Sequence, residues 1–77
     1  MSKCDLVVDA RGLSCPMPLV KASQSIKQVP IGGVIEVLAT DPASKEDIPR
    51  WARRMGHEVI EVREESGVFH VFIKRMK

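Results

Sequence analysis

The run DARGLSCPMP, residues 9–18, joins a short apolar segment to a segment with helical periodicity. The apolar segment favours a strand over about Asp5 to Asp9, and Leu19 begins a pattern typical of an amphipathic helix. Cys15 therefore lies where a strand passes into a helix. That position suits a reactive sulfur, because negative charge is stabilised at the start of a helix.

Two prolines shape the expected helix, which runs from Pro16 to about Gln28. If Cys15 is the N-cap, Pro16 takes the first helical position, where its missing N–H removes no hydrogen bond. Pro18 then takes the third position, so the Met17 amide is the donor left to point at the Cys15 sulfur. This arrangement favours the nucleophilic thiolate. The alternative is that Ser14 is the cap and Cys15 a small buried residue.

The same run resembles the CPxP signature of the TusA family of small sulfur-carrier proteins, also called SirA-like. The resemblance extends along almost the whole chain, through Val7 to Asp9, Leu19 to Ala22, Gly33, Thr40 to Pro42, Asp47 to Pro49 with Trp51, and a C-terminal hairpin. It implies a persulfide carried on Cys15. It also implies donors such as cysteine desulfurases or rhodanese-like proteins, and acceptors that serve tRNA thiolation, cofactor synthesis or sulfur oxidation.

The chain has 77 residues, which allow one domain with a small core. Its composition, 44% hydrophobic and 29% charged, is that of an ordinary folded domain and argues against disorder. The formal net charge of +2 is too small to predict nucleic-acid binding. We therefore expect a single domain over residues 1–77, and a monomer.

The two cysteines, Cys4 and Cys15, fit neither a C-x-x-C redox pair nor a metal framework. A strand between them, at about 3.3 Å per residue, would hold them beyond the ~7 Å Cα limit for a disulfide. Free thiols and the lack of an apolar signal region at the start of the chain favour the cytoplasm, with no membrane anchor. Cys4 is then expected in an N-terminal tail, either incidental or a second reactive thiol.

The segment from Val34 to Thr40 is rich in β-branched residues and is predicted to be an interior strand. A strand, helix and strand this close in sequence form a parallel, right-handed unit, which brings Asp9, Cys15 and Asp41 to one sheet edge. A carboxylate beside the thiol would oppose its ionisation, so we assign Asp9 and Asp41 to holding the loop. Asp41 before a proline is equally consistent with ordinary turn chemistry.

The other loop residues are expected to shape and expose the turn: Arg11, Gly12, Pro16, Met17 and Pro18. Arg11 is the better candidate for electrostatic help to the thiol, or else a docking side chain. We expect neither a metal nor a cofactor, because His57 and His70 lack ligand-like spacing and are interpreted as surface residues.

A second helix is expected with Asp47 as N-cap, which places Pro49 at the second helical position, and with its end at Gly56. Its predicted core stripe consists of Ile48, Trp51, Ala52 and Met55. Its opposite face carries Arg50, Arg53 and Arg54. These cations are either a solvated face or a surface for an acidic partner.

Two alternating segments, Glu58 to Glu64 and Val68 to Arg75, flank a hairpin turn at residues 65–67. The order β-α-β-α-β-β predicts a two-layer α/β sandwich with a mixed four-stranded sheet. The family resemblance implies strand order 1-2-4-3, both helices on one face, and a fold like the C-terminal domain of translation initiation factor three. Phe72 would then lie on the open face as a candidate contact surface.

The functional hypothesis is a sulfur carrier of the sulfurtransferase type, with a cysteine persulfide intermediate on Cys15. An alternative is a small RNA-binding or regulatory module that uses the arginines of the second helix, although fold analogy is a weak warrant for it. A thiol redox enzyme is disfavoured, because no resolving cysteine lies within reach of Cys15.

Overall fold

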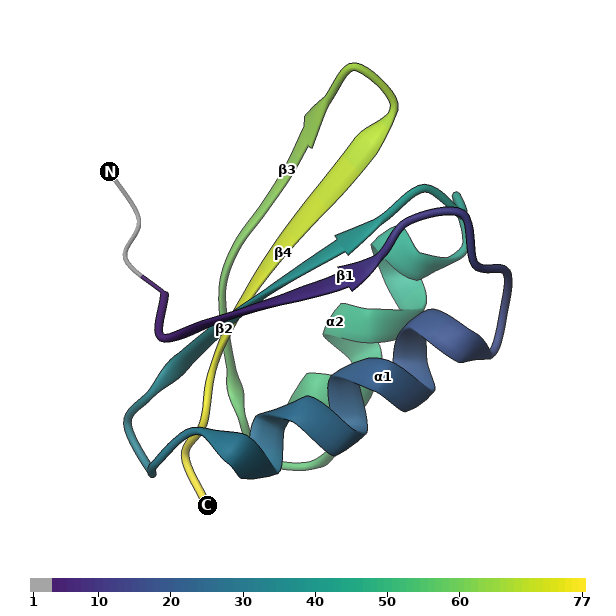
Figure 1. The fold of residues 1–77 in the computed structure, drawn as a ribbon. Helices are drawn as coiled ribbons and strands as arrows, with labels where there is room; N and C mark the ends of the chain where they lie inside the picture. Colours follow the sequence, from purple (N-terminus) through teal and green to yellow (C-terminus); the bar gives the residue numbers. More distant parts are fainter. Residues whose placement is uncertain (1–3) are drawn as a thin grey trace.

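The computed structural model describes residues 4–77 and forms a mixed four-stranded sheet with helices on one face (Figure 1). The elements follow in the order β1 (Leu6–Ala10), α1 (Met17–Ser25), the 3-10 turn η1 (Ile26–Gln28), β2 (Val34–Ala39), α2 (Ser44–Arg54), β3 (Glu58–Glu65) and β4 (Val68–Lys74). The strand order is β1-β2-β4-β3, with β1 parallel to β2 and β4 antiparallel to both of its neighbours. The predicted sandwich and strand order are confirmed.

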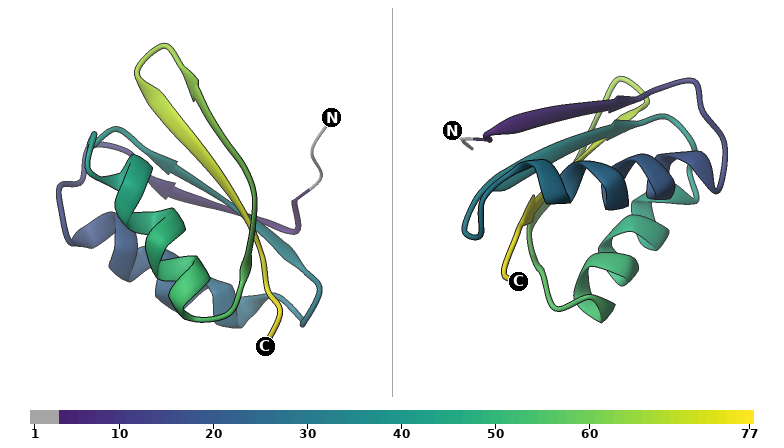
Figure 2. Two further views of the ribbon diagram at one scale, coloured as in Figure 1. Left: turned by 180° about the vertical axis from the view of Figure 1, so that it is seen from behind. Right: turned by 60° about the horizontal axis from the view of Figure 1, so that its bottom comes forward.

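Both helices lie on one side of the sheet, as the turned views show (Figure 2), and the core consists of side chains packed between the two layers. Side chains alternate along each strand, so every second residue of β2 and β4 points at the helices. The side chains at these positions include Ile35, Val37, Val71 and Ile73, which are fully buried. The helices add Ala22, Ile26, Ile48 and Ala52 to the same cluster. Aliphatic side chains therefore fill most of this core.

The second helix differs from its prediction at both ends. It begins at Ser44 with Ala43 as its N-cap, so Asp47 is not the N-cap, and in the turn that leads into it the Ala43 amide donates to Asp41 Oδ1 at 3.1 Å. Because the chain becomes helical earlier than expected, Pro49 lies inside α2, where it forfeits one backbone hydrogen bond. The helix ends at Arg54 and not at Gly56. Met55, which was predicted to belong to the core stripe, lies after the helix and is 51% exposed.

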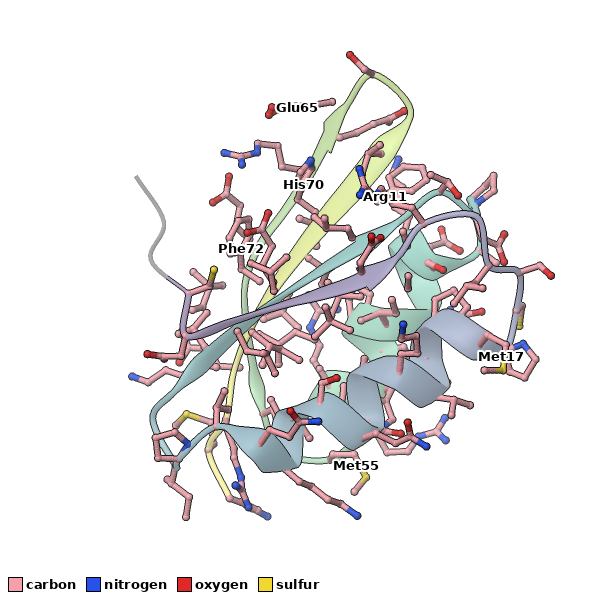
Figure 3. All side chains as sticks on the ribbon, viewed as in Figure 1. Arg11, Met17, Met55, Glu65, His70 and Phe72 are labelled. Carbon is pink, nitrogen blue, oxygen red and sulfur yellow. The ribbon has the colours of Figure 1, made fainter. Side chains whose placement is uncertain are left out.

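The sheet face opposite the helices is partly covered by its own side chains. Phe72 alternates onto this face but is only 2% exposed, so the prediction of a contact surface there is wrong. The Arg63 guanidinium lies 5.6 Å from the Phe72 ring centroid and covers part of it. Cys4 is half-buried beside Glu36 of β2 and is not in a free tail. Figure 3 labels Phe72 and its neighbour His70 on β4.

Candidate functional site

The loop between β1 and α1 lies at the carboxyl edge of the parallel strand pair (Figure 1). Ala10 at the end of β1 pairs with Ala39 at the end of β2, so the residues that follow both strands lie side by side. The predicted meeting of Cys15 and Asp41 is thereby confirmed, since the two residues are hydrogen-bonded. Asp9 remains within β1 and contacts Arg11 instead.

Cys15 is exposed, which rules out the buried packing cysteine weighed from the sequence. The start of the helix nevertheless differs from the prediction. Pro16 is the N-cap, α1 begins at Met17, and the Cys15–Pro16 peptide bond is cis. The Met17 amide donates to the Ser14 carbonyl at 2.9 Å, so the predicted contact between that amide and the Cys15 sulfur is wrong. A turn ahead of the helix has taken the amide that the sulfur was expected to use.

The cysteine loop is held in place by the two residues that follow β2. The Cys15 amide donates to Asp41 Oδ2 at 2.7 Å, and the other oxygen of that carboxylate accepts the Ala43 amide in the turn that leads into α2. The Gly12 amide donates to Thr40 Oγ1 at 2.9 Å. Gly12 itself has a φ of +78°, a conformation that glycine adopts without strain. These contacts hold the loop backbone and leave the Cys15 side chain outside.

Thr40 was not identified from the sequence as a site residue. The available signal was its position directly before Asp41, at the end of an apolar strand where polar side chains often serve the neighbouring loop. Lys21 was not identified either, and its Nζ donates to the Asp9 carbonyl at 2.9 Å and ties α1 to the end of β1. Both contacts span many residues of sequence, so local periodicity gives no sign of them.

Asp9 and Arg11 form a two-pronged ion pair at the other end of the loop. Arg11 Nε and one terminal nitrogen lie 2.9 and 3.0 Å from the two Asp9 oxygens, and the Arg11 amide donates to the same carboxylate. The side-chain hydrogen bond from Arg11, followed by its backbone hydrogen bond, lowers the pKa of Asp9 to about 2. Because the charge of Arg11 is balanced by Asp9, Arg11 contributes little to stabilising a thiolate at Cys15.

Replacing Arg11 with glutamine should move the titration of Asp9 back towards its ordinary value of 3.8. The pKa of Asp9 is depressed in the folded chain, so the stabilisation is complete above that ordinary value and is lost as the pH falls towards 2. NMR titration of the Asp9 carboxyl would measure the midpoint. Arg53→Gln is the matched control, and an unchanged Asp9 midpoint in Arg11→Gln would contradict this assignment.

Among the prolines and the methionine of the motif, one residue is buried and two are exposed. Pro18 is fully buried and anchors the start of α1 in the core. Pro16 is exposed, and Met17 is 45% exposed at the tip where the loop enters α1 (Figure 3). The sulfur of Cys15 thus has an open surrounding with an apolar neighbour, which lets a second protein reach it.

The three arginines predicted as docking candidates, Arg50, Arg53 and Arg54, are all exposed on α2. None of them forms an ion pair within residues 4–77. A hollow of about 190 Å³ between the helices is lined by Leu19, Asp47, Arg50, Trp51 and Arg54. Leu19 belongs to α1 and follows Cys15 by four residues, whereas the other lining residues belong to α2, so the hollow lies between the helix that follows the motif and the helix that carries the arginines.

Comparison with known proteins decides the family. The model of the family described as Sulfurtransferase TusA matches residues 6–75, which is most of the chain. The chain belongs to the TusA family. The sulfur carrier protein TusA of Allochromatium vinosum is 40% identical over 75 residues, covering 97% of this chain and 99% of that protein. The TusA of Pseudomonas putida strain GB-1 is 38% identical over 71 residues, covering 92% and 89%.

Solved structures support the same TusA-family assignment. The crystal structure of a SirA-like protein from Desulfitobacterium hafniense superposes with a TM-score of 0.81 at 28% identity, covering 94% of this chain and 99% of that one. The fold and the sulfur-carrier family predicted from the CPxP motif are therefore confirmed. Within residues 4–77, the helices are too short or too polar to cross a membrane.

The two histidines of this TusA-family chain are not simple surface residues, contrary to the prediction. His57 Nδ1 accepts the Met76 amide at 3.2 Å, and burial, with the charges of Arg75 and Lys77, lowers the pKa of His57. His70 Nδ1 lies 2.7 Å from Glu36 Oε2. The described part of the chain contains no group of three or more side chains arranged to hold a metal ion.

Proposed function

We propose that this chain carries sulfur as a persulfide on Cys15, taking it from a donor protein and passing it to an acceptor thiol. The observation that supports this proposal is the free, exposed Cys15 side chain on a loop whose backbone is held by Asp41 and Thr40. A carrier must be reached by two different proteins in turn, which an open loop permits and a deep pocket would hinder. Membership of a family described as sulfurtransferases gives the chemistry.

Each transfer exchanges one sulfur–sulfur bond for another. The Cys15 thiolate attacks the outer sulfur of the donor persulfide, the donor's S–S bond breaks, and the donor leaves as a thiolate. Cys15 then holds the outer sulfur, with its proton, as a persulfide. An acceptor thiolate attacks the same outer sulfur and releases the Cys15 thiolate. Electrons balance at both steps, so the relay itself requires no cofactor or metal.

The donor is proposed to be a cysteine desulfurase or a rhodanese-like protein, and the acceptor a thiol protein of tRNA thiolation, cofactor synthesis or sulfur oxidation. A reducing compartment such as the cytoplasm suits this work, because it keeps the Cys15 thiol free. Asp9, Arg11, Gly12, Pro16, Met17, Pro18 and Asp41 are proposed to support the site. Their proposed role is to hold and present the loop. Asp9 and Asp41 are carboxylates, which do not stabilise a thiolate, so they are not proposed to activate Cys15.

Peptide mass spectrometry after incubation with a cysteine desulfurase and cysteine tests the proposal. Trypsin cleaves after Lys3, Arg11 and Lys21, so the two cysteines fall on separate peptides. We expect one added sulfur atom on the peptide that contains Cys15 and none on the peptide that contains Cys4. Sulfur found only on the Cys4 peptide, or no loading with any donor, would reject the assignment of Cys15.

Arg50, Arg53 and Arg54 are proposed to dock an acidic surface of the donor, and Arg50 and Arg54 line the hollow beside Leu19. Replacing Arg50 or Arg54 with glutamate should slow loading by the protein donor about tenfold, because like charges then oppose each other at the encounter. Loading by inorganic polysulfide, which needs no docking surface, should be unchanged. Lys27→Glu is the matched control, since Lys27 is an exposed cation on the 3-10 turn at the other end of α1.

The alternative RNA-binding function predicts a different result for the same variants. RNA binding that weakens steeply with salt, persists in Cys15→Ser and is lost in Arg50→Glu would favour an RNA module over a carrier. Equal loading rates in Lys27→Glu, Arg50→Glu and Arg54→Glu would remove the docking role of the arginines.

A further inference from the structure

A second cysteine lies on the sheet face opposite the helices, beside a carboxylate with two partners. Cys4 Sγ donates to Glu36 Oε1 at 3.6 Å, and Glu36 Oε2 lies 2.7 Å from His70 Nδ1. Glu36 and His70 are diagonal neighbours on the paired strands β2 and β4, where side chains on one face are within reach. Because His70 engages the other oxygen, Glu36 is held against the Cys4 thiol.

The environment of Cys4 disfavours its ionisation. Burial raises the pKa of the Cys4 thiol, the hydrogen bond and the charge of Glu36 raise it further, and Asp5 adds a smaller contribution. A thiol that donates to a carboxylate must give up that hydrogen bond, and face a like charge, to become a nucleophile. Cys4 is therefore stabilised as the unreactive thiol.

Each cysteine of this chain has a carboxylate beside it, but the two carboxylates bind different atoms. Asp41 accepts the backbone amide of Cys15 at 2.7 Å and not its sulfur, which forms no hydrogen bond with the described residues 4–77. Glu36 accepts from the sulfur of Cys4 itself. Cys15 is exposed whereas Cys4 is half-buried. Burial and hydrogen bonding therefore both make Cys4 the less reactive of the two thiols.

We infer that Glu36, anchored by His70, is a positioning residue that keeps Cys4 out of sulfur transfer and confines loading to Cys15. The selection between thiols rests on the proposed function, whereas the low reactivity of Cys4 does not. A carrier with two open thiols would load at two places and could couple to a second carrier through a disulfide. The hydrogen bond to Glu36 limits both side reactions without removing the second cysteine.

Competitive alkylation with iodoacetamide, followed by peptide mass spectrometry, tests the inference. In the native chain Cys4 should react more slowly than Cys15, and in denaturant the two rates should become similar. Glu36→Gln should raise the Cys4 rate about tenfold, because the like charge beside the thiolate is removed while the shape of the side chain is kept. The Cys15 rate in the same molecules is the internal control for folding, and Glu64→Gln, an exposed carboxylate on β3, is the matched control.

Equal native rates for the two cysteines, or an unchanged Cys4 rate in Glu36→Gln, would overturn the inference. Loading with inorganic polysulfide separates it from the proposed function. In Glu36→Gln, added sulfur should appear on the Cys4 peptide as well as on the Cys15 peptide. If the Cys4 alkylation rate rises in Glu36→Gln but Cys15 never takes up sulfur, the carrier proposal fails and the role of Glu36 in suppressing Cys4 stands. If Cys15 loads and Cys4 alkylation does not respond, the role of Glu36 fails alone.

Discussion

Replacing Cys15 with serine should abolish sulfur transfer, with a loss of about a thousandfold or more relative to the unmodified chain. A serine hydroxyl is not ionised near neutral pH and forms no persulfide. The fold should survive, because the Cys15 side chain is exposed and its backbone amide still reaches Asp41. The measurement is transfer of labelled sulfur from a desulfurase to an acceptor thiol, with the intermediate followed by mass spectrometry.

Cys4→Ser is the matched control for this loss. It changes the same atom type elsewhere in the chain and should leave transfer nearly unchanged, because Cys4 is the thiol that donates to Glu36. Transfer that continues in Cys15→Ser and stops in Cys4→Ser would reverse the assignment. Transfer that continues in the double variant would show that the relay does not pass through this chain's thiols.

Replacing Asp41 with alanine should destabilise the fold by about 2 kcal/mol, because one carboxylate accepts two backbone amides, from Cys15 and Ala43. A domain of this length is stable by only about 4 to 12 kcal/mol, so the loss is a large share. Urea denaturation would measure it. Asp47→Ala is the matched control and should change stability by about 0.5 kcal/mol or less, because Asp47 is not the helix cap and alanine is a good helix former.

The same Asp41→Ala variant should slow sulfur transfer about tenfold while alkylation of Cys15 by a small reagent is not slowed. A protein partner needs the sulfur in a defined position, whereas iodoacetamide can reach a mobile loop equally well. If Asp47→Ala is the more destabilising of the two, the cap lies where the sequence placed it. If transfer and alkylation fall together, Asp41 acts on the thiol itself and not on its presentation.

Much of the fold could be predicted from local patterns, because they were strong where the elements are regular. The β-branched run of β2, the alternation in β4 and the apolar stripe of α1 each correspond to a buried face. The strand boundaries differ by one residue, and the last part of the first predicted helix is the 3-10 turn η1. Strand order came from the family resemblance, because periodicity alone does not pair strands.

The details of the site were less predictable, because they depend on contacts between distant residues. Spacing placed Cys15 near a helix start but could not show that the Met17 amide would bond to Ser14. The second helix was expected at Asp47 because Pro49 is unfavourable inside a helix, yet the helix begins at Ser44, after a turn in which Asp41 accepts the Ala43 amide. Phe72 was wrongly predicted to be exposed on the open face of the sheet. Alternation shows on which face a side chain lies, but not which neighbouring side chains cover it.

The carboxylate of Asp41 joins two parts of the molecule that a partner would meet separately. One oxygen holds the peptide that bears the sulfur, and the other holds the turn that leads into the helix that bears the arginines. Under the proposed docking, a partner that binds the arginines and shifts the start of α2 would also shift the backbone of Cys15. If the donor and the acceptor both dock on α2 as proposed, but in different positions, each would meet the Cys15 sulfur in a different orientation.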